Sequence, residues 1–437
     1  MADITAPGPR RSLTEAPQRS AETSGPLLAA DGTPLRRKLR QALFVSRMRA
    51  MGLATPLVLF VLLAFVFPIF VLLWQAVYND TFEDGMPRTT ELLAEWDAIS
   101  DPDEAMYAAV ITDLIEARDR ERALPTKVGA RVNREKSGSL SLFKKTNRRA
   151  QRLEAPFKEA MVDLDKKWGD IEYWRAMKVA SQSVSPAFVA SALDLHYTAD
   201  GTFEWEDPKR QIHLKLFLRT LEISLIVTLA TIALGYPVAY LLATLPARVS
   251  NLLLILVLLP FWTSILVRTT SWIAMLQSQG VMNDIFVWIG ITADDQRFSM
   301  IYNKLGTLIA MTHILLPFMI LPLYSVMKTI PPSYVRAAKS LGATNWTAFW
   351  RIYAPQTVPG IGAGAILVFI LAIGYYITPA LVGGQDGVMI SNIIDDHMRK
   401  SLNYSLAAAL GLVLLVFVLF LYWLYDRIVG IDNMKLG

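Results

Sequence analysis

Six long apolar stretches dominate the pattern of hydrophobic and polar positions along the chain. They cover residues 53–78, 223–247, 249–276, 305–327, 355–385 and 401–425. Each is longer than the roughly 20 residues that a helix needs to cross a bilayer. Only the third carries a charged residue, Arg268. Since an open chain in lipid satisfies its backbone hydrogen bonds only as helices, the pattern predicts an all-α polytopic membrane protein with six transmembrane helices.

The composition agrees with this class and excludes several kinds of chemistry. Of 437 residues, 53% are hydrophobic and 19% are charged, whereas soluble domains carry about 25% charged residues. The absence of cysteine excludes disulfides and thiolate metal sites. The four histidines are too far apart in sequence to form a helical metal site, so no metal site is expected.

The basic residues near the ends of the spans predict the orientation. Six basic residues and no acid lie between residues 36 and 49, and four basic residues and no acid lie between 328 and 354. We therefore expect both termini and the 328–355 loop to be cytoplasmic. Residues 1–35, rich in Pro, Ser, Thr and Ala, are expected to be disordered, and residues 36–78 to form the basic segment and the first transmembrane helix.

Residues 79–212 form a long insertion between the first two spans, on the expected periplasmic side. Apolar positions at helical spacing predict helices over 104–122 and from 157 to a break at Gly169, with Asp170 as the N-cap of the next helix. The insertion is interpreted either as a structural cap over the transmembrane helices or as a docking surface for an outer partner. Residues 213–437 would then hold transmembrane helices two to six.

The cytoplasmic loop 328–355 has the pattern of a rigid protrusion. Small residues precede Gly342, which predicts the end of one short helix, and a second helix is expected to end at Pro355. Two short helices that meet at a glycine would transmit force from a soluble partner better than a flexible tether.

The same loop resembles the EAA loop of permease subunits of type I ATP-binding-cassette importers. It matches that motif at Ala337, Ala338, Gly342, Ile352 and Pro355. Two positions depart from the motif, since Arg336 replaces the family's Glu and Ala354 replaces its Leu. Residues 259–263 with Arg268, 315–319 and 355–360 further resemble the spermidine/putrescine permease group.

The resemblance implies which partners this chain has and which subunit carries out each step of transport. Two permease subunits, expected to be different chains, would form the pathway in the bacterial inner membrane. A dimer of ATPases would bind ATP and Mg²⁺, and a periplasmic solute-binding protein would deliver the solute. This chain has no phosphate-binding loop, so we expect no enzyme activity and no cofactor of its own. Its remaining partner would be membrane lipid, and no nucleic acid is expected. Contact with the ATPase would fall to Arg336, Ala337, Ala338, Gly342, Ile352 and Pro355.

The solute is expected to be a polyamine or a similar small organic cation. The alternative is the same type of importer with another small solute, such as an opine, an amino-acid derivative or iron. A secondary transporter would be favoured by inverted repeats, and a membrane sensor by a cytoplasmic signalling domain; we see neither in the sequence.

Five polar or aromatic residues within or beside the spans are candidates for the pathway. Arg268, expected near the outer end of a straight helix, either snorkels to the interface or has a functional role, as a gate or in a pair with an acid such as Glu222. Glu222 itself either caps the second span or forms an ion pair, or it contacts a cationic solute. His313 either bonds a neighbouring helix or lines the pathway. Tyr375 and Tyr376 belong either to the interfacial aromatic belt or to a site that holds ammonium groups on aromatic faces.

Overall fold

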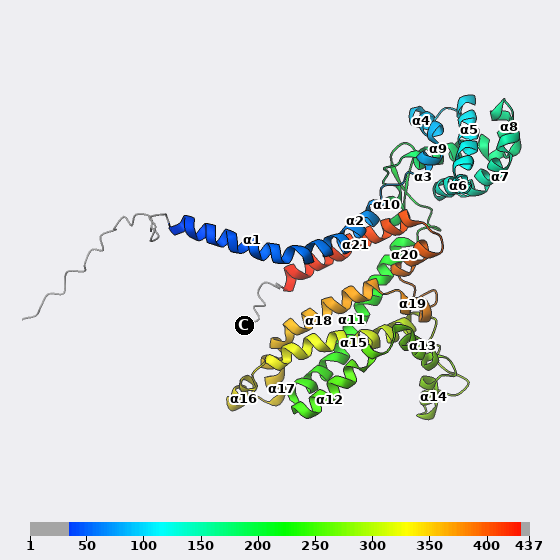
Figure 1. Ribbon diagram of the computed structural model, residues 1–437. Coiled ribbons are helices and arrows are strands. Elements are labelled where there is room, and N and C mark those ends of the chain that lie inside the picture. The colour runs from blue at the N-terminus through cyan, green and yellow to red at the C-terminus, as the bar shows by residue number, and fades with distance from the viewer. Residues whose placement is uncertain (1–34, 430–437) are drawn as a thin grey trace, which may run out of the picture. The chain divides into compact units, whose positions relative to one another are not determined.

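The computed structural model describes residues 35–429 and is almost entirely helical (Figure 1), which confirms the predicted all-α fold. It divides into two units, one up to Phe70 and one from Val71 onward. The disorder expected for residues 1–34 and the side chains of the basic cluster from Arg36 to Arg40 lie outside the described part of the structure.

The described part of the first unit is a helix that continues into the second unit. α1 (Leu35–Val61) leads through a π-turn at Leu62–Val66 into α2 (Phe67–Trp74), and residues Ser46–Trp74 are long and apolar enough to span a membrane. Side chains such as Phe60 and Leu63 are exposed. Exposed apolar side chains along a helix of this length are what a lipid environment requires.

Residues 81–205 form a small helical domain, whose core is built by residues from Phe82 to Ala180. Its helices are α3 (Thr81–Gly85), α4 (Pro87–Glu95), α5 (Glu104–Arg120), α6 (Leu124–Glu135), α7 (Ser139–Arg149), α8 (Phe157–Leu164), α9 (Ile171–Ser181) and α10 (Ala187–Ala192), with 3-10 turns at Ala150–Arg152 and Lys166–Gly169. The strands β1 (Leu195–Tyr197) and β2 (Phe203–Trp205) pair as an antiparallel hairpin.

The core of this domain is aromatic. Trp168 and Trp174 are fully buried, and both the Tyr107 hydroxyl (2.8 Å) and the Trp174 indole (2.9 Å) donate to the Trp168 carbonyl. The predicted N-cap is confirmed, since Asp170 accepts from the Glu172 amide at 3.0 Å. The helix expected from residue 157 up to the break at Gly169 ends earlier, at Leu164, because Asp165 turns extended and caps a 3-10 turn instead.

Three long helices pack together to form the centre of the membrane bundle. They are α11 (His213–Thr244), α15 (Lys304–Thr329) and α18 (Ala354–Gly374), and their shared core includes Val227, Leu315 and Val368. Small residues bring α15 and α18 close, because a Cβ at Gly364 would collide with Met319. The remaining helices are α12 (Ala247–Leu258), α13 (Ile265–Leu276), α14 (Val281–Trp288), α16 (Pro332–Ser340), α17 (Asn345–Ala348), α19 (Ile377–Val382), α20 (Ile390–Arg399) and α21 (Tyr404–Val429).

Two of the six predicted spans are broken rather than continuous. Five helical segments could cross a membrane unaided, and the sixth is a pair, Ala247–Trp262 and Ile265–Trp288, bent by 98°. The straight helix predicted over 249–276 is therefore wrong, because a 3-10 turn containing Pro260 ends the first half and Ser264 caps the second half. The span predicted over 355–385 stops at Gly374, where the backbone becomes extended before α19.

Candidate functional site

The loop 328–355, which is expected to be cytoplasmic, contains α16, and this helix ends as predicted at a glycine. Gly342 has φ +90°, the left-handed conformation that glycine adopts without strain. The Ala343 amide donates to the Ala338 carbonyl and the Gly342 amide to the Lys339 carbonyl, both at 3.0 Å. This is the hydrogen-bond pattern of a Schellman motif, which fixes the direction in which the chain leaves the helix.

The second helix of the loop does not end at Pro355, so that part of the prediction is wrong. Thr344 caps α17 by accepting from the Thr347 amide at 3.2 Å. A π-turn at Phe349–Tyr353 then joins α17 to α18, and Pro355 occupies the first turn of α18. The missing amide of proline is tolerated there. The loop is thus continuous with a membrane helix, without a flexible joint.

Aromatic rings tie this π-turn to α11. Phe349 contacts Tyr236 (6.1 Å between ring centroids) and Tyr240 (5.7 Å) edge to face, and Tyr353 contacts Tyr240 at 5.4 Å. The Tyr236 hydroxyl also lies 3.2 Å from Thr357 Oγ1 on α18. A displacement of the loop would therefore move α11 and α18 together.

The outer surface of the loop exposes apolar side chains. Leu341 is 90% exposed and Trp346 is 72% exposed, and Trp350 stacks edge to face on Trp346 at 5.5 Å. Of the six predicted coupling residues, Ala338 is half-buried, and Arg336, Ala337, Gly342, Ile352 and Pro355 are exposed or partly exposed. Large exposed apolar side chains beside exposed basic ones favour contact with another protein.

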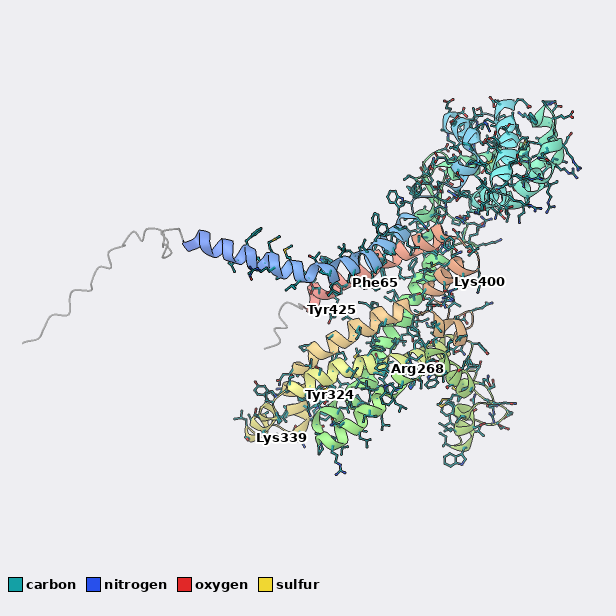
Figure 2. The ribbon with its side chains drawn as sticks, viewed as in Figure 1. Phe65, Arg268, Tyr324, Lys339, Lys400 and Tyr425 are labelled. Atoms are coloured by element: carbon teal, nitrogen blue, oxygen red, sulfur yellow. The ribbon has the colours of Figure 1, made fainter. Side chains whose placement is uncertain are left out.

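A cavity of about 650 Å³ lies beneath α16. It is lined by residues of α11, α15, α16 and the π-turn, among them Arg336, Lys339, Phe349 and Tyr240. Arg336, which stands where the resembled motif has Glu, is therefore placed with Lys339 on a basic wall. Figure 2 labels Lys339 at this end of the bundle and Arg268 toward the other end.

Arg268 lies in the first turn of α13, directly after the bend, and not near the end of a straight helix as predicted. It is half-buried, and its Nε atom has no hydrogen-bond partner within residues 35–429. Next to it, Thr269 Oγ1 lies 3.2 Å from Thr378 Oγ1, which links α13 to α19. An arginine at a helix break, away from carboxylates, can meet a solute or act as an electrostatic barrier.

His313 is bonded to the same broken span. The Trp272 indole donates to His313 Nδ1 at 3.1 Å, joining α13 to α15. Because an indole nitrogen only donates, Nδ1 is the acceptor and a neutral His313 carries its proton on Nε2. Sequence reasoning missed Trp272, since nothing in its local pattern distinguishes it from the other tryptophans near span ends.

Glu222 does not pair with Arg268 and does not cap a helix. α11 begins at His213, so Glu222 lies in its third turn, where it forms an ion pair with Lys304 of α15. The cap is Asp194, which is 1% exposed and accepts from the His213 amide (3.1 Å), the Leu214 amide (2.9 Å) and His213 Nδ1 (2.8 Å). Asp194 was missed because it lies far upstream in the sequence, within the insertion.

Tyr375 and Tyr376 occupy the gap between α18 and α19. Their carbonyls accept from Ser391 Oγ and Asn392 Nδ2, each at 2.7 Å. The Tyr376 ring faces the Arg399 guanidinium at 5.8 Å, and Arg399 also donates to its hydroxyl at 3.0 Å. Arg399 therefore already provides a cation for the Tyr376 ring, which leaves Tyr375 as the better candidate for contact with a solute.

The described residues contain no group of three or more His, Cys, Asp or Glu side chains that could hold a metal ion. The arrangement has an exposed loop rigidly joined to a membrane bundle, and half-buried polar groups at the breaks of two spans. Such groups can bind or exclude a solute.

Comparison with known proteins decides the class. A family model described as "Binding-protein-dependent transport system inner membrane component" matches residues 232–429. The spermidine/putrescine transport system permease protein PotB of Escherichia coli K12 is 34% identical over 244 residues, which cover 55% of this chain and 87% of PotB. The chain belongs to this permease family. It is therefore a membrane permease subunit of a binding-protein-dependent importer of the ATP-binding-cassette class, located in the inner membrane, and not a catalytic subunit.

Two further matches describe the breadth of the likeness. The inner membrane ABC transporter permease protein YdcU of E. coli K12 is 31% identical and covers 46% of this chain and 68% of YdcU. A solved bacterial alginate ABC transporter, in complex with an alginate pentasaccharide-bound periplasmic protein, is 22% identical with a TM-score of 0.43, over 50% of this chain and 80% of that chain.

Proposed function

We propose that this permease carries polyamines or similar small organic cations, and that a separate dimer of ATPases hydrolyses ATP with Mg²⁺ to drive it. The observation that supports the solute class is the 34% identity to a permease named for spermidine and putrescine. A permease of Mycobacterium bovis named for molybdenum is 28% identical, so molybdate is a necessary competitor in the test.

The loop 328–355 is the proposed ATPase contact. Its apolar tip, Leu341 and Trp346, supplies the surface that a partner would bury. The Schellman turn and the aromatic contacts to α11 supply the stiffness, because a docked loop moves the membrane helices only if it does not bend first. The unusual Arg336 would face an acidic or neutral partner position rather than a basic one.

The proposed pathway passes the breaks of the third and fifth spans, where Arg268 and Tyr375 lie, and His313 of α15, which is bonded to the third span through Trp272. A positive charge at Arg268 repels a cationic solute, so we propose that Arg268 acts as an electrostatic barrier. The change between the outward and inward states would move Arg268 out of the pathway. Glu222, already paired with Lys304, would contact the solute only if that pair opens. A solute-binding protein on the outer side and a second permease, proposed to be a different chain, complete the assembly.

Uptake by the reconstituted importer tests this function. The complete complex, with its ATPase, second permease and binding protein, is placed in vesicles with labelled spermidine or putrescine. We expect ATP-dependent accumulation that excess unlabelled polyamine abolishes and that opine, iron or molybdate leaves unchanged. Accumulation of one of those competitors in place of polyamine would overturn the solute assignment, and accumulation without ATP would overturn the coupling.

A further inference from the structure

A cavity of about 590 Å³ lies where two membrane spans meet the helical domain. It is lined by residues 75–81, which follow the first candidate span, by α6, and by residues 401–405 at the start of α21. The first span ends at Trp74 and the last begins at Tyr404, so the cavity lies at the boundary of the membrane. The polar headgroups of phospholipids occupy this level. Asn79 Nδ2 donates to Ser405 Oγ at 2.8 Å and holds the two edges together.

The wall formed by α6 contains a buried arginine, two of whose donor atoms are buried and unpaired in the described part of the chain. Arg131 is 2% exposed, and its Nη1 atom lies 2.5 Å from Glu135 Oε1. Its Nε and Nη2 atoms have no hydrogen-bond partner in the described part of the chain. Its guanidinium lies 4.6 Å from the centroid of the Phe188 ring, which closes that side. Buried donors are costly without an acceptor, and a guanidinium fork fits a phosphate group well.

The cavity also carries charges of both signs that have no partner within residues 35–429. Arg134, one turn after Arg131, is exposed and forms no ion pair there. Although part of its surface is open to solvent, desolvation by the surrounding protein and the charge of Arg131 lower its pKa to about 10, against an opposing effect of Glu135, so it remains charged at neutral pH. On the other wall the Asp80 carboxylate accepts from the Tyr78 hydroxyl at 3.3 Å and contacts no basic residue. Lys127 is already paired with Glu121 at 2.8 Å.

We propose that this cavity binds the headgroup of phosphatidylethanolamine, with the phosphate against Arg131 and Arg134 and the primary ammonium against Asp80. The start of the long helix α21, with its partial positive charge, adds to the attraction for phosphate. A phosphoglycerol headgroup offers no positive charge to Asp80. A phosphocholine headgroup has a positive charge but no N–H to donate. The bound lipid would hold the helical domain against the membrane.

Native mass spectrometry of the purified full chain, titrated separately with phosphatidylethanolamine, phosphatidylglycerol, phosphatidylcholine and inorganic phosphate, tests the proposal. We expect phosphatidylethanolamine to bind most tightly. Arg134→Gln should weaken it by about tenfold, the effect of losing one charge-assisted hydrogen bond. Asp80→Asn should reduce its affinity to that of phosphatidylglycerol. Both residues are exposed, so neither change should prevent folding.

Matched controls are Arg118→Gln and Asp119→Asn, which remove exposed charges from α5, away from the cavity. Neither should change the affinity. Equal affinity of all four variants for phosphatidylethanolamine would overturn the site. If inorganic phosphate displaced the lipid, and its binding depended on Arg134, the cavity would be a site for a free anion and not for a lipid. If Asp80→Asn left the preference for phosphatidylethanolamine over the other lipids unchanged, the proposed role of the ammonium group would be wrong.

Discussion

Gly342 is the residue on which the shape of the loop 328–355 depends. At φ +90° a β-branched side chain is strained, by about 2 kcal/mol or more, although no neighbouring atom lies within 4 Å of the position that a Cβ would take. We expect Gly342→Val to redirect the chain after α16 and so to abolish uptake while the ATPase still hydrolyses ATP. Parallel assays of solute uptake and phosphate release measure this uncoupling.

Gly290 offers a matched control for that substitution. It too has a positive φ, +75°, and open space around a Cβ, but it lies in the turn after α14. Gly290→Val should introduce similar strain and leave uptake close to that of the unmodified chain. If the importer with Gly342→Val transported solute normally, or if Gly290→Val abolished uptake equally, the prediction of a special role for Gly342 would be wrong.

His397 makes the stability of α20 depend on pH. Burial lowers its pKa below the usual value, as do the nearby charges of His213 and Arg134, against a smaller opposing effect of Asp396. The unfolded chain therefore binds the proton more readily than the folded one, so stability is full above about pH 6.5 and falls as the pH drops below it.

Thermal unfolding between about pH 5 and pH 8 measures this dependence. We expect the melting temperature to fall toward the acid end, and the fall to be smaller in His397→Gln, whose amide can keep the contact with Ser401 Oγ, now 2.9 Å from Nδ1. A melting temperature that rises on acidification would contradict the assigned direction.

At the scale of elements, the sequence was sufficient wherever a single stretch of residues determines the outcome. The long apolar runs around α11, α15 and α21 predicted three spans, and Asp170 and Gly342 marked a helix start and a helix end. The bend at Thr263–Ser264 was missed because Pro260 alone is compatible with either a kink or a break. The π-turn before Pro355 was missed for a similar reason, since proline usually marks a helix boundary.

The loop helices offer two substitutions with opposite expected results. Phe349→Ala removes the ring that contacts Tyr236 and Tyr240 and should cost about 2 kcal/mol of stability, less than for a fully buried phenylalanine. It should also weaken coupling while the ATPase still binds. Leu341→Ser changes a side chain that is 90% exposed, so stability should shift by less than about 0.5 kcal/mol.

Leu341→Ser should instead reduce the amount of ATPase that co-purifies with the permease. Melting temperatures and pull-down yields of the two variants distinguish the role of Phe349, which attaches the loop to α11, from the role of Leu341, which is proposed to contact the ATPase. If Phe349→Ala lost ATPase binding and Leu341→Ser kept it fully, Phe349 rather than Leu341 would belong to the ATPase contact, and the assignment of the two residues would be reversed.

At the scale of the whole molecule, the contacts that sequence could not predict are those between distant segments. Asp194 of the insertion caps α11, Lys304 holds Glu222, and Trp272 bonds His313. Each partner lies at least 19 residues away, and more than 40 in two cases, so no local period or spacing reveals it. The cap by Asp194 also means that the insertion is joined structurally to the second span and is not an independent appendage.

The orientation of the chain in the membrane can be tested directly because the sequence contains no cysteine. A single cysteine at Ile99, 74% exposed in the helical domain, or at Leu341, 90% exposed in the loop, would be the only reactive thiol. If the positive-inside rule holds, a membrane-impermeant maleimide should label Ile99→Cys in intact spheroplasts and Leu341→Cys only in inverted vesicles. The unmodified chain should remain unlabelled in both. Labelling of Leu341→Cys in intact spheroplasts would place the loop outside, where no ATPase could reach it, and would overturn the coupling mechanism while leaving the family assignment intact.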